Sequence, residues 1–389
     1  MLKSHFQRII AMNTLSGIGM SLIGIFTPIY FLHLNYPVSN VILYLVIQHT
    51  TILVGAFLVV YLSNIIGLVK CWYIRVVFVS LLLIGLLVLP KYPNILFLLA
   101  FINGLEAAFF WIPLNILMIR KTEEKSMGSS LALMSNVSSV FGIITPLISA
   151  FIIINFGYNL LFVLALMFVM FSILPILSFS NEKTAFHFKL SRIKEIVAEN
   201  KHFIIPEILD NLGQDAQVVW SLFLVITALS VLDIGVLGVV SSLIGIIITH
   251  ITGKFIDQSD KKKIVRFGAV ATTITWFLSY LIAVYSPTPL LLYVITMLRG
   301  FSLGIFASAY GVIMLNRARQ SDAQFIVLRE IPTVFGRLFI FTMTLIFISY
   351  NKIELSFLMV SILSIYFWFN NLDVLTHKNS DNLLIENKL

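Results

Sequence analysis

Charge and cysteine are scarce in this sequence. Only 11% of its 389 residues are charged, whereas 59% are hydrophobic. A soluble domain carries about 25% charged residues, so this chain has too few to cover a water-facing surface. The single cysteine, Cys71, excludes an internal disulfide and any metal site built from several cysteines. The composition therefore indicates a helical protein that crosses a membrane many times.

Signals of a bound cofactor are missing as well. The seven histidines are scattered without the spacing of metal ligands. No Gly-rich loop of the form G-x-x-x-x-G-K-[ST] occurs, so nothing indicates the use of ATP. No nucleophile and base stand out as a pair. We therefore expect no metal, no cofactor and no enzymatic activity.

Long apolar runs make up most of the chain. A transmembrane helix needs about 20 apolar residues, and twelve runs near or above that length occur. The predicted fold class is an all-α integral membrane protein with twelve transmembrane helices in two pseudo-symmetric six-helix bundles. The runs lie at residues 9–34, 41–66, 72–90, 94–119, 128–154, 158–180, 202–231, 233–256, 264–286, 288–316, 323–350 and 353–372.

The positions of the 26 basic residues indicate how the chain is oriented in the membrane. With the N-terminus in the cytoplasm, twenty of them fall in cytoplasmic segments and two, Lys91 and Lys352, in outer turns. Because Lys and Arg gather on the cytoplasmic side, both termini are expected there, in the plasma (inner) membrane. The same rule explains the net charge of +8 without a nucleic-acid partner. The expected partners are the lipid bilayer, a small-molecule substrate and a proton or other ion, and the chain is expected to be a monomer.

A polar interruption at residues 181–201 divides the chain. Its apolar and charged residues interleave as in an amphipathic helix on the cytoplasmic surface. The predicted organisation is an N-terminal bundle (1–180), this linker (181–201), a C-terminal bundle (202–376) and a cytoplasmic tail (377–389).

The two halves read as copies of one another. The segment NGLEAAFFWIPLNILMIR, which contains Gly104, aligns with RGFSLGIFASAYGVIMLNR, which contains Gly300. Further on, SSVFG and PTVFG end at Gly142 and Gly336. Both offsets are close to half the chain, as in transporters built from a duplicated bundle.

A charged loop at 253–263, GKFIDQSDKKK, separates the eighth and ninth runs. It resembles the loop signature of the major facilitator superfamily, G-x-x-x-D-[RK]-x-G-x-[RK]-[RK]. A weaker match to this signature, VYLSNIIGLVK at 60–70, lies between the second and third runs, where the family carries its main copy. The resemblance implies an alternating-access transporter, and it implies that one set of residues acts as a cytoplasmic latch: Gly253, Asp257, Lys262, Lys263, Asn64 and Gly67.

Two readings of this loop remain open. The carboxylate of Asp257 can hold the positive end of a facing helix, or the loop is a solvated turn that only sets the topology. Asn64 stands where the signature has Asp, so a latch in the first half is expected to be weaker. A second fragment, Gly142 to Pro146, partly resembles the family's antiporter signature and slightly favours export, although it also fits a simple bend in the helix.

Ionisable residues inside the apolar runs are the candidates for function, because each costs roughly 2.5–3.5 kcal/mol to insert. Glu106 and Asp215 are the proton- or ion-coupling candidates, since burial disfavours the charged carboxylate. A structural hydrogen bond is the alternative for Glu106. Arg75 is expected to extend toward the cytoplasm.

The seventh run is the most polar, with a stripe at helical spacing. Its acids are either cavity-lining or merely solvated at the cytoplasmic end. The deep arginines either pair with Glu106 and Asp215 or bind an anionic substrate group. The cavity and substrate candidates are Asn115, Asp210, Asn211, Gln214, Gln217, Arg299 and Arg337.

The sequence thus predicts a secondary active transporter that moves a small molecule, coupled to a proton or ion gradient, with a slight preference for export. A nutrient importer or lipid flippase on the same fold is one alternative. A membrane interaction or sensor protein that has lost transport is another.

Overall fold

The computed structural model describes residues 5–121, 127–177, 201–227, 229–256, 261–285, 287–320 and 323–369, with the single residues 179, 181, 183 and 198. Within these ranges the regular structure is helical, and no strand occurs. The elements are α1 (His5–Gly24), α2 (Phe26–His33), α3 (Val38–Ile66), α4 (Leu68–Val88), η1 (Pro93–Ile95), α5 (Leu96–Lys121), α6 (Met127–Phe171), η3 (Leu174–Ile176), α8 (Lys201–Ile226), α9 (Val231–Ile256), α10 (Lys261–Tyr285), α11 (Pro289–Gln320), α12 (Ala323–Ser349), α13 (Leu355–Ser364) and α14 (Tyr366–Phe369).

Nine segments of the described ranges are long and apolar enough to cross a membrane. One of them, Ile143–Ile176, covers most of the fifth and sixth predicted runs. The run predicted at 202–231 corresponds to α8, which is not among the nine segments because it contains many polar residues. The last predicted run corresponds to the short helices α13 and α14. The all-helical membrane architecture is confirmed, whereas twelve separate helices are not reproduced.

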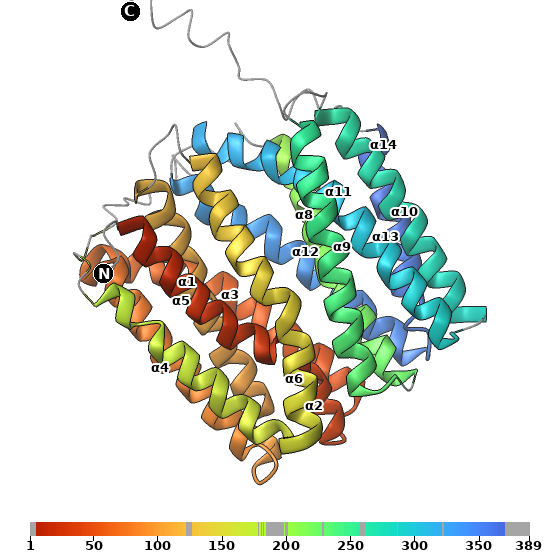
Figure 1. Cartoon of the computed structure of the whole chain (residues 1–389), viewed down its shortest axis with the longest axis horizontal. Coiled ribbons are helices and arrows are strands. Elements are labelled where there is room, and N and C mark those ends of the chain that lie inside the picture. The colour runs from red at the N-terminus through yellow and green to blue at the C-terminus, as the bar shows by residue number, and fades with distance from the viewer. Residues whose placement is uncertain are drawn as a thin grey trace, which may run out of the picture.

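The chain reverses inside α6 at a single residue. Gly157 has φ +81° and ψ 173°, a conformation that favours glycine. Figure 1 shows the two arms of α6 meeting at this point, where yellow passes into yellow-green. A one-residue turn is too short to separate the fifth and sixth runs into two elements, which explains the lower count.

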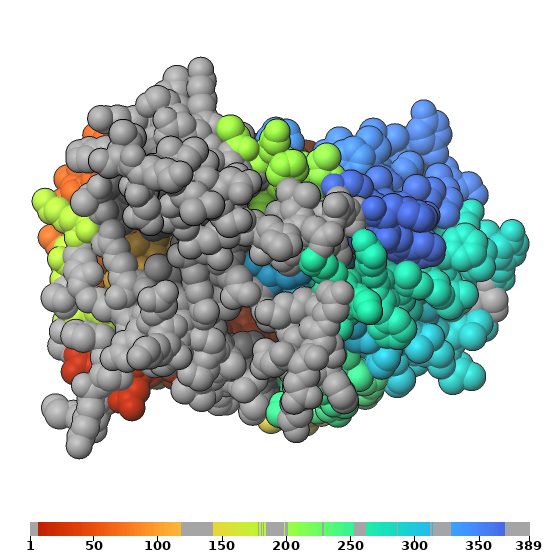
Figure 2. Space-filling model, turned by 90° about the horizontal axis from the view of Figure 1, so that it is seen from above, coloured from red at the N-terminus to blue at the C-terminus, as the bar shows by residue number. Residues whose placement is uncertain are grey.

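The helices form two groups that follow the order of the sequence. In Figure 1, α1 to α6 gather on one side and α8 to α14 on the other. Figure 2, seen from above, likewise has the coloured residues of the first half on the left and those of the second half on the right. The two groups meet where α3 packs on α12 and where α6 packs on α9.

Glycines bring corresponding helices together in each half. A Cβ on Gly104 of α5 would lie 2.4 Å from the carbonyl oxygen of Gln48 in α3. A Cβ on Gly300 of α11 would lie 3.0 Å from the carbonyl oxygen of Ser241 in α9. The two glycines that align in the sequence therefore serve the same contact, between the fourth and second long helices of their half.

The fragment that resembles an antiporter signature lies partly at the seam between the halves. Pro146 of α6 packs on α9, since a Cβ on Gly235 would lie 3.0 Å from the Pro146 carbonyl oxygen. A Cβ on Gly238 would lie 3.0 Å from the Cβ of Pro146. These two glycines allow the close approach of α6 and α9.

The two signature loops are described to different extents. Gly67 ends α3 with φ +92°, and the side-chain amide of Asn181 donates a hydrogen bond to the Ile66 carbonyl oxygen beside it. In the second loop, Gly253 lies in α9, while Lys262 and Lys263 lie in the first turn of α10. Asp257 is outside the described residues, as are most of the predicted linker (181–201) and the whole tail (377–389).

Candidate functional site

The first half contains a buried ion pair that the sequence analysis did not predict. Nε of Arg75 on α4 lies 2.7 Å from Oε1 of Glu106 on α5. The two residues are 2% and 3% exposed, and the Arg75 guanidinium also lies 4.1 Å from the ring centroid of Phe110. Contrary to expectation, Arg75 therefore does not extend toward the cytoplasm, and Glu106 does not pair with Arg299 or Arg337. The alternative for Glu106, a structural hydrogen bond between helices, agrees with this contact.

Asp215 occupies the contact between the two halves. Its Oδ2 lies 3.4 Å from Nε of Arg337 on α12 and 3.6 Å from Nε2 of His49 on α3. The His49 ring also stacks on Phe341, with centroids 5.4 Å apart and an angle of 15°. Both contacts of the Asp215 carboxylate are longer than ordinary hydrogen bonds. The carboxylate therefore joins the two halves through an electrostatic attraction that a small movement can break. We call His49, Asp215 and Arg337 the inter-half trio.

A second acid on α8 is fully enclosed. Glu207 is 0% exposed, and its Oε1 accepts hydrogen bonds from Nε of Arg329 at 2.7 Å, the amide of Asn211 at 3.0 Å and the hydroxyl of Thr333 at 3.1 Å. Arg337 then reaches Asn211, with 3.4 Å between Nη2 and Oδ1. Glu207 therefore ties α8 to α12 within the second half and is not a solvated surface group.

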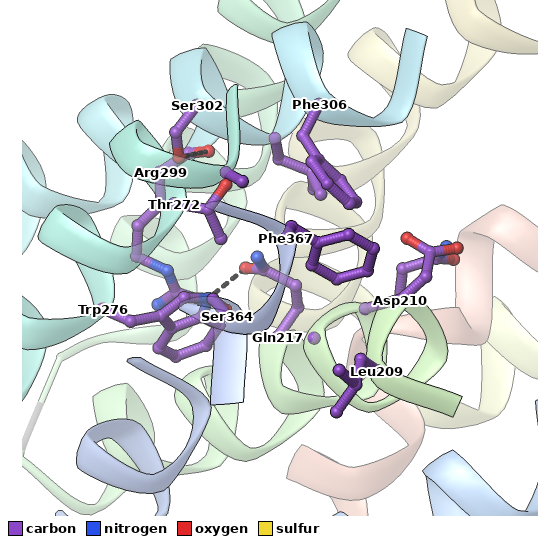
Figure 3. Close-up of a pocket in the computed structure, with 14 residues that line it drawn as sticks. Leu209, Asp210, Gln217, Thr272, Trp276, Arg299, Ser302, Phe306, Ser364 and Phe367 are labelled. Atoms are coloured by element: carbon purple, nitrogen blue, oxygen red, sulfur yellow. Dashed lines mark hydrogen bonds between the residues drawn. The ribbon is translucent and has the colours of Figure 1, made fainter. Parts of the chain in front are cut away.

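A cavity lies inside the second half, between α8, α10, α11 and the α13–α14 segment (Figure 3). It offers about 30 Å³ to the centres of water-sized molecules, more than the roughly 10–15 Å³ that one water needs. Asp210, Gln214 and Gln217 line it from α8, and Arg299 lines it from α11. The sequence-predicted stripe thus faces a cavity at these positions, while Asn211 turns toward α12.

Arg299 has no acidic partner within 4 Å among the residues that the structure describes. Its guanidinium carbon lies 3.7 Å from the ring centroid of Trp276 and 4.7 Å from that of Trp220. One nitrogen donates a hydrogen bond to the carboxamide oxygen of Gln217, which Figure 3 marks with a dashed line. Cation–π contacts are strongest when desolvated, and Arg299 is 2% exposed.

Of the remaining candidates, Asn115 lies apart from these groups and Asp210 belongs to the cavity. Asn115 is half-buried on α5, and among the described residues it belongs neither to the inter-half trio nor to the cavity lining. Asp210 is 6% exposed and accepts a hydrogen bond of 2.8 Å from the amide of Gln214. His49 was not among the predicted site residues, because the histidines are scattered in the sequence. Its central place in a long apolar run was the signal that could have identified it.

Comparison with known proteins identifies the family. The sequence profile of the Major Facilitator Superfamily matches residues 9–227. The fold resembles the crystal structure of a D-xylose-proton symporter (TM-score 0.70, 11% identity, 94% of this chain and 96% of that chain). It also resembles the structure of a bacterial metal transporter (TM-score 0.64, 12% identity, 95% of this chain and 100% of that chain). At these identities the likeness concerns the fold.

One relative in sequence is a protein of Bacillus subtilis (strain 168), described as uncharacterized protein YqgE. It is 26% identical over 257 residues, which cover 62% of this chain and 59% of that protein. The chain belongs to the Major Facilitator Superfamily, whose members are membrane transporters. It is a multi-pass membrane protein.

Proposed function

We propose that this protein is a secondary active transporter that works by alternating access and uses Asp215 to couple transport to a proton gradient. The observation that carries the proposal is the inter-half trio, in which a carboxylate of the second half faces a histidine of the first half and an arginine of its own half. A proton that binds to this carboxylate changes the force between the halves.

The electrostatics of the trio give the direction of this effect. Ionised Asp215 attracts Arg337 and the polar imidazole of His49, so it holds α3 against α8 and α12. Protonated Asp215 loses its charge, and both attractions weaken. Proton uptake therefore favours separation of the halves at this level, and proton release favours their contact.

Glu106 has a different role in this proposal. Its partner Arg75 belongs to the same half, and both residues are enclosed. A pair within one rigid bundle does not change when the bundles move past each other, and breaking it is costly. We assign Glu106 to the stability of the first half, and we keep only Asp215 as the coupling group.

The direction of transport is proposed as export, in line with the Gly142 to Pro146 fragment. The proposed orientation keeps both termini in the cytoplasm of a plasma (inner) membrane, with the chain acting as a monomer. Asp257 and the lysines after it form the stronger cytoplasmic latch, and Asn64 contributes the weaker one.

Transport by reconstituted protein tests the proposal. Full-length protein in proteoliposomes is given an inward or outward pH gradient, and the movement of a labelled panel of small organic molecules is followed. Gradient-driven accumulation of at least one compound is expected. Asp215→Asn is expected to reduce the pH-driven accumulation at least tenfold, because Asn cannot bind or release the proton. Exchange of the same compound across the membrane is expected to be preserved.

Asn115→Asp is the matched control, since it makes the reverse exchange, an amide for a carboxylate, at a position outside the trio. Its accumulation is expected to stay dependent on the gradient. If Asp215→Asn transports with the same pH dependence as the unmodified protein, proton coupling at Asp215 is refuted. If no compound moves in either direction, the protein is better described as an interaction or sensor protein.

A further inference from the structure

An arginine that is buried without an acid has unused binding capacity. Nε and Nη1 of Arg299 have no hydrogen-bond partner among the described residues, and the side chain is enclosed. The guanidinium lies over the rings of Trp220 and Trp276, which accept no conventional hydrogen bond from it. The N–H donors of the guanidinium are therefore incompletely used and can serve an anion.

Gln217 contacts this guanidinium from within the cavity (Figure 3). A carboxamide oxygen is neutral, so it gives a charged donor a weaker partner than a carboxylate oxygen does. It also belongs to a flexible side chain that can rotate aside. The Gln217 oxygen therefore lies where an oxygen atom of an anionic ligand would bind.

Polar groups at the other end of the cavity limit the choice of ligand. Figure 3 shows Asp210 on the side of the cavity away from Arg299. Asp210 already accepts one hydrogen bond, from Gln214. An ammonium or hydroxyl group can donate a further one, whereas a second anionic group would be repelled. The small space excludes a large molecule unless the helices move.

We propose that this cavity is a binding site for a small carboxylate whose anionic group contacts Arg299 in place of Gln217 and whose far end donates a hydrogen bond to Asp210. The class includes small amino acids and hydroxy acids. That the bound molecule is the cargo rests on the proposed transport function, whereas binding at Arg299 does not.

Binding is measured with the full-length protein in lipid nanodiscs. Glycine, glycolate, acetate and inorganic phosphate are titrated against sodium chloride at constant ionic strength. The readouts are tryptophan fluorescence, because two tryptophans flank Arg299, and the temperature of unfolding. We expect a saturable response to the three carboxylates that chloride does not give, with glycine and glycolate binding more tightly than acetate. A response to phosphate alone, or no response beyond that of chloride, overturns the proposal.

Variants of Gln217 make the test specific. Gln217→Glu places a permanent carboxylate beside Arg299, so this variant is expected to unfold at a higher temperature and to lose the response to carboxylates. Gln217→Ala removes the competing oxygen and is expected to bind acetate severalfold more tightly. Ser221→Ala, on the same helix but outside the cavity lining, is the control and is expected to keep the affinity for acetate within twofold. A carboxylate response that persists in Gln217→Glu overturns the proposal. This test does not require the direct variant, Arg299→Gln, to fold.

Asp210→Asn tests the other end of the cavity. Loss of its charge is expected to strengthen acetate binding and to abolish the preference for glycine over acetate. An unchanged preference overturns the assignment of Asp210. The outcomes also separate the two proposals, since carboxylate binding without transport refutes only the transport function, and transport without carboxylate binding at Arg299 refutes only the site.

Discussion

Each half of this protein contains a buried arginine, and the two arginines have different kinds of partner. Arg75 has a carboxylate 2.7 Å away, so the first half carries a complete internal ion pair. Arg299 has two aromatic rings and a glutamine, and two of its nitrogens lack partners among the described residues. A charge that is satisfied supports a fixed structure, whereas a charge that is incompletely satisfied can bind a ligand.

The aligned positions make the difference between the halves specific. Arg299 precedes Gly300 as Asn103 precedes Gly104, so the two residues occupy equivalent places in the repeat. Asn103 donates a hydrogen bond of 2.9 Å to the hydroxyl of Tyr44 and is thereby satisfied within its own half. From these positions we infer that the first half is the more fixed scaffold and the second half the part that binds.

The largest effect is expected from breaking the pair in the first half. Replacing one partner, as in Arg75→Met or Glu106→Gln, leaves the other enclosed without its partner and is expected to cost about 3–5 kcal/mol of unfolding free energy. Arg299→Met leaves no carboxylate unpaired and is expected to cost about 1–3 kcal/mol, the range for one unsatisfied polar group. Denaturant unfolding in mixed micelles measures both.

The double variant Arg75→Met with Glu106→Leu is the control for that comparison. Removing both charges is expected to restore most of the lost stability, because neither partner is then buried alone. Equal losses from Arg75→Met and Arg299→Met would contradict the contrast between the halves.

Glycine packing is expected to have an intermediate effect that is similar in the two halves. A Cβ on Gly336 of α12 would lie 2.1 Å from the carbonyl oxygen of Ile208, and one on Gly104 would lie 2.4 Å from that of Gln48. Gly336→Ala and Gly104→Ala are each expected to cost about 1–3 kcal/mol. Gly213, with no atom within 4 Å of a Cβ, is the control, and Gly213→Ala is expected to stabilise α8 by up to about 1 kcal/mol. Thermal unfolding of the purified variants ranks them, and a stable Gly336→Ala would refute the close approach.

The smallest effect is expected at the turn between α3 and α4. Asn181→Ala removes the hydrogen bond to the Ile66 carbonyl oxygen, which lies in an exposed place, and is expected to cost about 0.5–1.5 kcal/mol. Gly67→Ala at the same turn is the comparison, because its backbone φ of +92° disfavours a side chain and its Cβ would lie 2.2 Å from Asn181. Limited proteolysis near residue 67 reports the loosening, and a larger loss in Asn181→Ala than in Gly67→Ala would count against this arrangement.

The sequence was sufficient for the architecture because the membrane constrains it strongly. Apolar run length, the sidedness of Lys and Arg and the aligned Gly104 and Gly300 all reflect local rules that act on short segments. The count of helices was less reliable, since Gly157 joins two spans through a turn of one residue and α8 is too polar to read as a span by hydropathy.

The shared face of the polar residues of α8 was predictable from the sequence, whereas the contacts between helices were not. Asp210, Gln214 and Gln217 repeat at helical spacing, so their common face could be read from the sequence, and Arg299 was recognised by its depth. Which acid meets which arginine depends on how helices far apart in the chain pack. That is why Glu106 was matched with the wrong arginines, and why His49 was not connected with Asp215.

The contact between Gln217 and Arg299 has a consequence for the transport cycle. A carrier that returns empty must reorient its halves without cargo, and an arginine with no hydrogen-bond partner at the cargo position would oppose that step. Gln217 gives Arg299 a neutral acceptor there in the absence of ligand, so the empty site need not wait for a counter-substrate. If the cavity binds the cargo, net movement driven by the proton gradient follows, rather than obligatory one-for-one exchange.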